Sequence, residues 1–524
     1  MMKKMEGEKY ESNEKLFNIK FDITKKPILL LIIITTCGLL IRFFYTPFDV
    51  PITLDGFSGY FLYALDISIL GHFPKYTLSQ SGWGEFLSLF FMNFHSENMI
   101  DYMNLQRVVS VILSGITVIP IYFICKKFFS EYYSLIGAII FAFEPRIILN
   151  SILGISEPLY ILAISLGVLF FLSSNKKLIY SSFGFFAWVT IIRPEGQFWF
   201  VSFSIIYFLR FRKYSKDLLK YLIPLLIFLL VLSPFVYHRI QCCENDAIIG
   251  RILIEISNYD NSQSKSDEQK SAPYGPNWFS GIKLFGWTLI PILIIFIPLG
   301  LIPIFRNFRY PNYLLIVTSA ILAAPIIYST SIAPDTRYVF ALFPFFCVIS
   351  LFGIKWISNH FNNKKIILGI IIIAIISSSM VFLDIKKIDF SEEKEAYQIT
   401  QLIINDIKGV NDGPLLIRYF PIVEMQNKWP IKETSGEYVK KYGINIISTS
   451  DHNTLNEFLI SEESNITHLI IDENENNPEY ILDILENEKK YPFLIKEFDS
   501  TEYDFSYVTK LYKIDYNIFK EIEN

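Results

Sequence analysis

The chain has 524 residues, of which 52% are hydrophobic, 16% aromatic and only 19% charged. A soluble core does not normally hold 48 Phe and 31 Tyr, whereas lipid-facing helices with aromatic residues at both membrane interfaces do. The composition therefore excludes an ordinary soluble protein and indicates a chain that crosses a membrane many times.

Charge divides the sequence into two parts. From Asp384 onward there are 28 acidic and 15 basic residues, whereas the preceding part carries 23 acidic and 32 basic ones. We therefore predict a cytoplasmic tail over residues 1–26, a transmembrane domain over 27–383 and an acidic domain over 384–524. The five cysteines show no metal-ligand spacing, and the sequence indicates no cofactor.

Hydropathy predicts about eleven transmembrane helices, each near the twenty residues that a bilayer requires. The first is interpreted as a retained helix, since no small-x-small cleavage site follows it. The predicted spans are Pro27–Tyr45, Asn104–Cys125, Tyr132–Leu149, Pro158–Leu172, Leu178–Ile192, Gln197–Leu209, Leu219–Tyr237, Ile282–Phe305, Tyr313–Tyr328, Tyr338–Trp356 and Ile366–Leu383.

Basic residues gather in the N-terminal tail and after every second predicted span. This regularity places the N-terminus and these loops in the cytoplasm, because cytoplasmic loops are enriched in Lys and Arg. With an odd number of spans, the acidic domain lies outside the plasma membrane. The basic pairs and runs are Lys126-Lys127, Lys176-Lys177, Arg210 to Lys220, Arg306 with Arg309, and Lys364-Lys365.

The first outer loop, Thr46 to Met103, is too long to be a simple connector. It contains two amphipathic aromatic stretches, Gly56–Leu70 and Trp83–Phe94, which we interpret as helices lying in the membrane interface. Ordinary loop helices packed on the bundle are the alternative. Interfacial helices would shape a groove that a lipid-linked substrate enters sideways.

Several charged residues fall at membrane level on the predicted outer side. Charges at that depth are costly, and they usually pair or line a polar cavity. For any one of them snorkelling, an ion pair or, for Asp55, a helix cap is an alternative, but together they favour a shared outward-facing cavity. They include Asp55, Glu157, Arg193, Glu195, His238, Arg239 and Arg337.

Four motifs on this outer side occur in a suggestive order. Asp55 is followed by Tyr60 and Ala64, and the later motifs are Phe143-Glu144-Pro145 with Ser156-Glu157-Pro158, Arg193-Pro194-Glu195-Gly196, and Asp335-Thr336-Arg337-Tyr338-Val339-Phe340 with Pro344. Together they resemble the C-type glycosyltransferases that use polyprenyl-phosphate sugars, such as the protein O-mannosyltransferases and aminoarabinose transferases. The resemblance covers roughly Pro27 to Leu383.

The resemblance implies roles for several residues on this outer side. Asp55 would be the general base, and Arg337, Lys75 and Arg193 would bind the donor phosphate. The substrate would be supported by Glu157, Tyr60, Glu195, His238 and Arg239.

The sequence also departs from that family. Gly56 follows Asp55 where some members carry a second acid, which weakens the case for a bridging metal but leaves divalent-metal dependence open. The Trp-Trp-Asp-Tyr-Gly signature of oligosaccharyltransferases is missing from the sequence, which argues against en bloc glycan transfer. There is no phosphate-binding Gly-rich loop for a nucleotide.

The acidic tail alternates helix-like and strand-like segments, which predicts a small α/β domain. The expected strands are Leu415–Tyr419, Ile444–Ser448, His468–Asp472 and Tyr507–Ile514, and the expected helices are Glu392–Lys408, Gly436–Tyr442, Thr454–Glu462 and Pro478–Lys490.

The sequence thus predicts a polytopic α-helical membrane protein with a small extracytoplasmic α/β domain. Its hypothetical activity is the transfer of one sugar, with inversion, from a polyprenyl-phosphate donor in the bilayer to an extracytoplasmic protein, glycan or lipid; nucleic acid is not a partner. A transporter of lipid-linked glycans and a non-catalytic envelope protein are the alternatives. The sequence shows no internal repeat that would favour a transporter.

Overall fold

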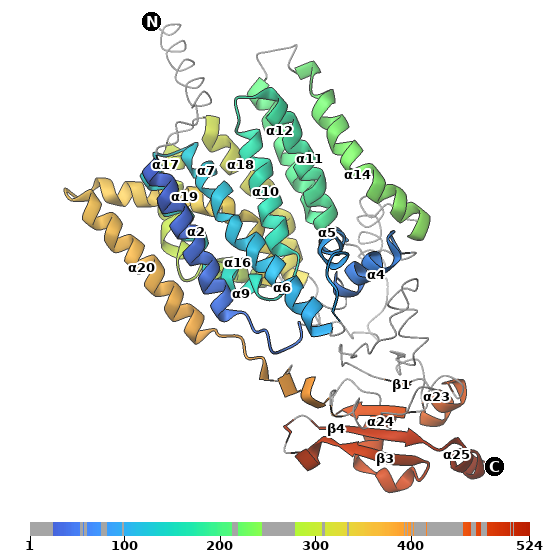
Figure 1. Ribbon diagram of the computed structural model, residues 1–524. Coiled ribbons are helices and arrows are strands. Elements are labelled where there is room, and N and C mark those ends of the chain that lie inside the picture. The colour runs from blue at the N-terminus through green and yellow to red at the C-terminus, as the bar shows by residue number, and fades with distance from the viewer. Residues whose placement is uncertain are drawn as a thin grey trace, which may run out of the picture. The chain divides into compact units, whose positions relative to one another are not determined.

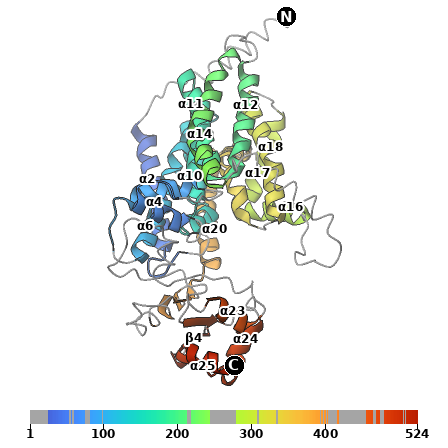
Figure 2. The same cartoon turned by 90° about the vertical axis from the view of Figure 1, so that its right-hand side faces the viewer.

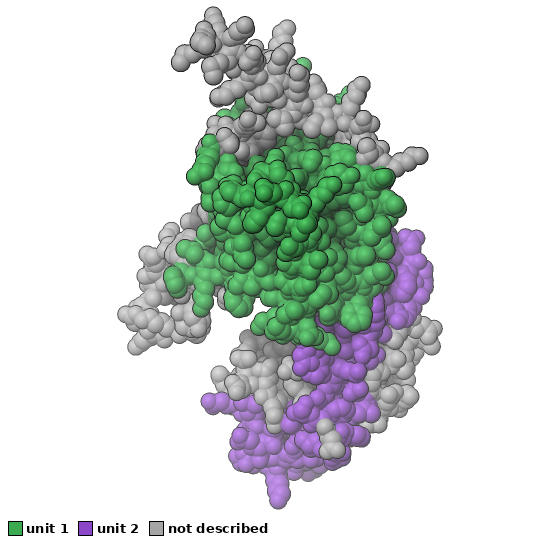
Figure 3. Space-filling model, turned by 90° about the vertical axis from the view of Figure 1, so that its left-hand side faces the viewer, with its two compact units in different colours: residues 1–46, 75–83, 107–388 green, residues 47–74, 84–106, 389–524 purple. Residues whose placement is uncertain are grey.

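The computed structural model divides into two compact units, which Figure 3 distinguishes by colour. Unit 1 comprises residues 1–46, 75–83 and 107–388, and unit 2 comprises residues 47–74, 84–106 and 389–524. The residues that the structure describes are 25–52, 56, 60–74, 81–96, 99–211, 218–243, 278–306, 310–332, 335–391, 394–395, 397–399, 402, 415–416, 454–462, 468–472, 479–503, 505–506 and 508–523.

Unit 1 consists of apolar helices (Figure 1). In the described residues of both units taken together, five helices are long and apolar enough to cross a membrane. The number rises to seven if each of two bent helix pairs is one span. The helices are α2 (Lys25–Tyr45), α6 (Met99–Ile116, which begins in unit 2), α7 (Val118–Lys126), α8 (Glu131–Ala142), α9 (Pro145–Ser151), α10 (Glu157–Phe171), α11 (Lys176–Ile192), α12 (Gln197–Phe211), α14 (Leu222–Cys243), α16 (Trp278–Thr288), α17 (Leu293–Arg306), α18 (Tyr310–Ile332), α19 (Phe343–Asn359) and α20 (Lys364–Ile385).

The chain is an integral membrane protein, as its sequence predicts. The two bent pairs are α8 with α9, at 51°, and α16 with α17, at 97°. Helices α10, α11 and α12 have 15, 17 and 15 residues. They are shorter than the roughly twenty residues of a straight span, so the count of eleven spans stays a prediction.

Arg42 of α2 joins three helices inside unit 1. Its side chain is fully buried, and it donates hydrogen bonds to Ser114 Oγ at 2.9 Å, Gly38 O at 2.8 Å and Ala142 O at 2.9 Å. Since a charge among apolar helices needs such partners, Arg42 fixes α2 and α6 against the end of α8.

Helix α11 lies among α10, α12 and α14, and both cartoon views show these helices running side by side (Figures 1 and 2). Their contacts are largely aromatic. Phe186 of α11 stacks on Trp199 of α12 with ring centroids 6.4 Å apart, and it packs on Phe203 at 4.4 Å. This packing fixes the C-terminal end of α11, which is followed by Arg193 and Glu195.

Unit 2 contains helices of the segment predicted to be the first outer loop, and it contains the C-terminal sheet. Helix α4 (Leu62–Leu70) lies within the first stretch predicted to be helical, and α5 (Gly82–Phe91, which begins in unit 1) begins one residue before the second. The chain around them is anchored by Asn104 and Gln106, whose side-chain amides donate to Phe48 O at 2.9 Å and Gly56 O at 3.1 Å.

The sheet of unit 2 has the strand order β1-β2-β4-β3. Strand β1 (Leu415–Leu416) pairs with β2 (His468–Asp472) in parallel, whereas β4 (Thr509–Ile514) is antiparallel to both β2 and β3 (Leu494–Asp499). His468 lies opposite Lys513, and β3 has an irregularity between Lys496 and Phe498.

Among the described residues, three short α-helices accompany this sheet: α23 (Leu455–Glu462), α24 (Glu479–Glu486) and α25 (Tyr516–Glu523). Their buried side chains share one core with the strands, including Phe458, Leu469, Ile484 and Phe519. The predicted strands at β2 and β4 are found, and β3 falls in a stretch for which no strand was expected. The predicted elements at 436–442 and 444–448 lie outside the described residues.

Candidate active site

The sequence Arg193-Pro194-Glu195-Gly196 forms a tight turn between α11 and α12. Arg193 is extended, with φ −146° and ψ 134°, as expected of a residue before proline. A short 3₁₀ helix, η2 (Pro194–Gly196), follows, and Gly196 N donates to Arg193 O at 2.9 Å. This turn presents the side chains of Arg193 and Glu195 to the same pocket.

Arg193 is held by carboxylates and by aromatic rings. Its Nη1 forms a buried ion pair and hydrogen bond with Oε1 of Glu157, the first residue of α10. Its Nε lies 3.6 Å from Glu195 Oε2, and its guanidinium lies 5.8 Å from the ring centroid of Tyr160 and 5.3 Å from that of Tyr338. Four side chains therefore fix the position of one cation.

Arg337 is presented by a second short 3₁₀ helix, η3 (Thr336–Leu342), which leads into α19. Asp335 caps η3 by accepting a hydrogen bond from Arg337 N at 2.8 Å, and its other oxygen pairs with Arg337 Nε. The Arg337 and Asp335 side chains are 30% and 29% exposed, unlike the buried Arg193 pair. Arg337 is thus ordered but accessible to a ligand.

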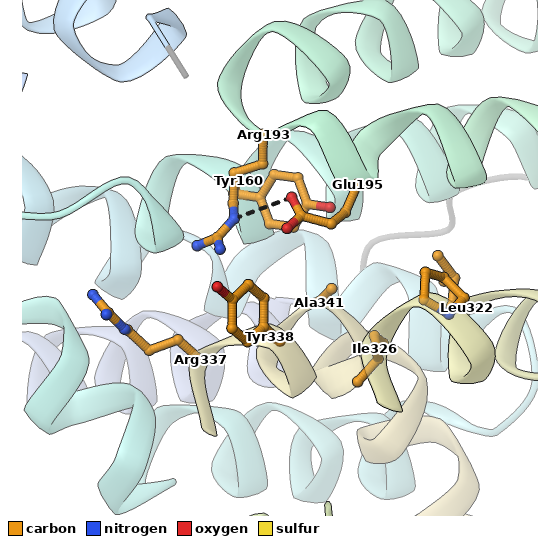
Figure 4. A pocket seen from close by; sticks show the side chains of 9 residues that line it. Tyr160, Arg193, Glu195, Leu322, Ile326, Arg337, Tyr338 and Ala341 are labelled. Atoms are coloured by element: carbon orange, nitrogen blue, oxygen red, sulfur yellow. Dashed lines mark ion pairs between the residues drawn. The ribbon is translucent and has the colours of Figure 1, made fainter. Parts of the chain in front are cut away.

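One pocket, with about 340 Å³ of space up to its open mouth, brings these groups together. Figure 4 shows Arg193, Glu195 and Arg337 toward one side, and Leu322 and Ile326 of α18 toward the other. Its lining residues are Tyr160, Arg193, Glu195, Leu322, Pro325, Ile326, Arg337, Tyr338 and Ala341. The pocket therefore combines two guanidinium groups with an apolar wall, an arrangement suited to an amphipathic anion.

Of the residues predicted for the site, Arg193, Glu195 and Arg337 line this pocket, and Glu157 contacts Arg193. Asp55 and Lys75 lie outside the described residues. His238 and the buried Arg239 lie on α14, and Tyr60 lies in unit 2. None of these last three is among the lining residues, so their roles stay predictions.

Two further residues of the pocket have signals in the sequence. Tyr160 lies three residues after Glu157, a spacing that places both on one face of α10. Tyr338 directly follows Arg337 in the last of the four motifs, although the resemblance implies no role for it. The apolar wall from α18 has no sequence signal, because Leu322, Pro325 and Ile326 resemble any lipid-facing residues of a membrane helix.

Within the described part of the chain, no group of three or more His, Cys, Asp or Glu side chains could hold a metal ion. The carboxylates near Arg193 are arranged around a guanidinium instead.

Solved structures of two enzymes share this architecture. ArnT from Cupriavidus metallidurans, bound to undecaprenyl phosphate, superimposes with a TM-score of 0.58 over 92% of this chain and 97% of that chain, at 10% identity. The Archaeoglobus fulgidus oligosaccharyltransferase AglB, with an inhibitory peptide and a dolichol-phosphate, gives a TM-score of 0.53 over 92% of this chain and 74% of that chain, at 12% identity. The chain has the fold of the C-type membrane glycosyltransferases.

The C-type fold confirms, at the level of architecture, the resemblance expected from the four motifs. Overall sequence similarity does not reveal this fold. No protein-family model matches the sequence, and no curated protein matches it either.

Proposed function

We propose that this protein transfers one sugar from a polyprenyl (dolichyl-type) phosphate donor to an acceptor outside the cytoplasm. The observation that carries the proposal is the pocket, in which Arg193 and Arg337 lie beside an apolar wall from α18. A phosphate linked to a polyprenyl chain needs both features, since its head is anionic and its tail is apolar. ArnT and AglB, which share the fold, have been solved with such lipid phosphates.

In the proposed reaction, an acceptor hydroxyl oxygen bonds to the anomeric carbon as the bond from that carbon to the phosphate oxygen breaks. The electron pair of the broken bond stays on the phosphate, and Asp55 takes the hydroxyl proton. Arg337 and Arg193 stabilise the negative charge that develops on the phosphate. The products are a glycosylated acceptor and the polyprenyl phosphate. Inversion follows from a single displacement with one base and no enzyme nucleophile.

The orientation belongs to the same proposal. With the N-terminus in the cytoplasm, the pocket opens to the outer side, and residues 384–524 form an extracytoplasmic domain. The regular spacing of basic loops supports this arrangement. Asp55 and Lys75, in the first outer loop, would then lie on the same side of the membrane as the pocket.

The test is release of polyprenyl phosphate by purified protein from a labelled polyprenyl-phosphate hexose. We expect Asp55→Asn to abolish transfer without lowering expression, and Arg337→Ala to weaken donor use about tenfold to a hundredfold, the value of one charge-assisted hydrogen bond. Asp384→Asn is the matched control, because it removes a carboxylate from an exposed position at the end of α20. Full activity in Asp55→Asn, or an unchanged donor dependence in Arg337→Ala, would overturn these assignments.

A further inference from the structure

Two carboxylate oxygens near Arg193 are buried without a hydrogen-bond partner among the described residues. They are Oε2 of Glu157 and Oε2 of Glu195. The Glu157 side chain is 3% exposed and uses only Oε1 for Arg193. Glu195 is 26% exposed overall, but its Oε2 is covered and lies 3.6 Å from Arg193 Nε, which is too long for a hydrogen bond.

Arg193 donates a hydrogen bond to neither of these two oxygens. Its guanidinium is already fixed by Glu157 and lies against the rings of Tyr160 and Tyr338. The backbone of Glu195 is also fixed, because η2 packs closely on the last turn of α11. A Cβ on Gly196 would lie 2.5 Å from Thr190 N and from Val189 O. The Glu195 acceptor is therefore built into the turn, whereas Glu157 is at the start of α10.

Buried acceptors of this kind are costly to leave unsatisfied, so they indicate a ligand that donates hydrogen bonds. The phosphate of the proposed donor cannot do this, because its oxygens are themselves acceptors. Hydroxyl or ammonium groups can. The other end of a polyprenyl-phosphate sugar, the sugar itself, carries such groups within a few ångströms of the phosphate.

The charges around the pocket restrict this sugar further. Two guanidinium groups, of Arg193 and Arg337, face three carboxylates, of Glu157, Glu195 and Asp335. The formal sum is already one negative charge before an anionic phosphate enters. A sugar that carries its own carboxylate would add a further like charge in a partly desolvated site.

We propose that the carboxylate of Glu195, which lines the pocket, binds hydroxyl or ammonium groups of the donor sugar, and that the acidic groups around it exclude acidic sugars. This inference rests on the proposed function and makes Glu195 its specificity-determining residue. Glu195 is the side chain to test, since replacing Glu157 would also leave Arg193 buried without its counter-ion.

The experiment measures the dissociation constants of three ligands for the full-length protein in nanodiscs: polyprenyl phosphate, polyprenyl-phosphate hexose and polyprenyl-phosphate hexuronate. We expect Glu195→Gln to weaken hexose-donor binding about tenfold, because a charge-assisted hydrogen bond becomes a neutral one. Binding of bare polyprenyl phosphate should change by less than about twofold on the same scale. Asp384→Asn should alter neither value.

A second comparison needs no variant and covers the case in which Glu195→Gln fails to fold. The wild-type protein should bind the hexuronate donor at least about tenfold more weakly than the hexose donor. Equal binding of those two donors, or equal shifts of bare lipid and hexose donor in Glu195→Gln, would overturn the inference while leaving the proposed function in place. If the wild type binds neither polyprenyl phosphate nor any donor, the proposed function fails, and the inference fails with it.

Discussion

Two clusters of acidic and basic side chains in the described part of this molecule have their hydrogen bonds satisfied in different ways. Around Arg193 in unit 1, the Oε2 atoms of Glu157 and of the pocket residue Glu195 have no hydrogen-bond partner among the described residues. In unit 2, four charged side chains form ion pairs with one another: Glu488, Lys496, Asp499 and Lys510.

In the unit 2 cluster every carboxylate oxygen has a donor. Glu488 Oε1 accepts from Lys510 Nζ at 2.5 Å and Tyr512 Oη at 3.0 Å, and its Oε2 lies 3.3 Å from Lys496 Nζ. Asp499 Oδ1 accepts from Thr501 N and Oγ1, and its Oδ2 accepts from Lys496 Nζ at 3.1 Å.

The comparison distinguishes charged groups that stabilise the fold from charged groups that can bind a ligand. A complete network rigidifies its surroundings and has no capacity for another partner. An incomplete network at a pocket has acceptor atoms without a hydrogen bond, and a substrate can donate hydrogen bonds to them. Similar residue types therefore indicate a structural role in unit 2 and a binding role in unit 1.

The largest expected effect comes from removing the cation of the pocket. Arg193→Met should destabilise the protein by about 3–5 kcal/mol, because it leaves the buried Glu157 carboxylate without its counter-ion. Thermal unfolding in detergent would measure this loss. Donor binding should disappear as well, since the pocket loses one of its two guanidinium groups.

A double variant distinguishes these two effects. Arg193→Met combined with Glu157→Gln removes both charges, so most of the lost stability should return while donor binding stays absent. If the double variant regains binding together with stability, Arg193 acts only as a structural ion pair.

The next effect concerns the turn rather than its charges. Gly196→Ala should cost about 1–3 kcal/mol, because the new Cβ would clash with the backbone of Val189 and Thr190. Donor affinity should also fall, since Arg193 and Glu195 shift with the turn. Gly369→Ala in α20 is the matched control, because nothing lies within 4 Å of a Cβ there. Donor binding that survives Gly196→Ala unchanged would show that the turn does not position the site.

The sequence predicted the parts of this site that follow from local chemistry. Charges near the ends of apolar segments marked Glu157, Arg193, Glu195 and Arg337, since such residues need a polar cavity. The ring of Tyr338 on Arg193 and the wall from α18 depend on how distant helices pack, which hydropathy does not encode. Similarly, β2 and β4 follow from apolar alternation, whereas β3 (Leu494–Asp499) has exposed and charged residues and was missed.

The complete network of unit 2 should make that unit sensitive to acid. Burial raises the pKa of Asp499, but hydrogen bonds from Thr501 and Lys496 outweigh it and hold the pKa below its ordinary value. Glu488 is similar: burial raises its pKa, but hydrogen bonds from Lys510 and Tyr512 outweigh burial and hold the pKa below its ordinary value. A depressed carboxyl pKa contributes stability above its unfolded value, near pH 4, which is lost as the pH falls through the folded pKa.

Hydrogen exchange of the β4 amides in the full-length protein, corrected for the intrinsic pH dependence, would report this loss. Protection should decline below about pH 4. Asp499→Asn should weaken protection at neutral pH by about 1 kcal/mol, or about fivefold in exchange rate, and should flatten the decline. An unchanged pH profile in Asp499→Asn would assign the acid sensitivity to other groups.

The smallest effect is expected where a charge pair is exposed. Lys394 Nζ lies 3.0 Å from Asp49 Oδ2 within unit 2, but the two side chains are 53% and 66% exposed. Water and salt screen such a pair, so Lys394→Ala should change stability by less than about 1 kcal/mol. Thermal unfolding of Lys394→Ala beside Asp499→Asn would measure the contrast. A larger loss in Lys394→Ala would show that proximity of opposite charges, rather than completeness of their hydrogen bonds, governs the stability of this unit.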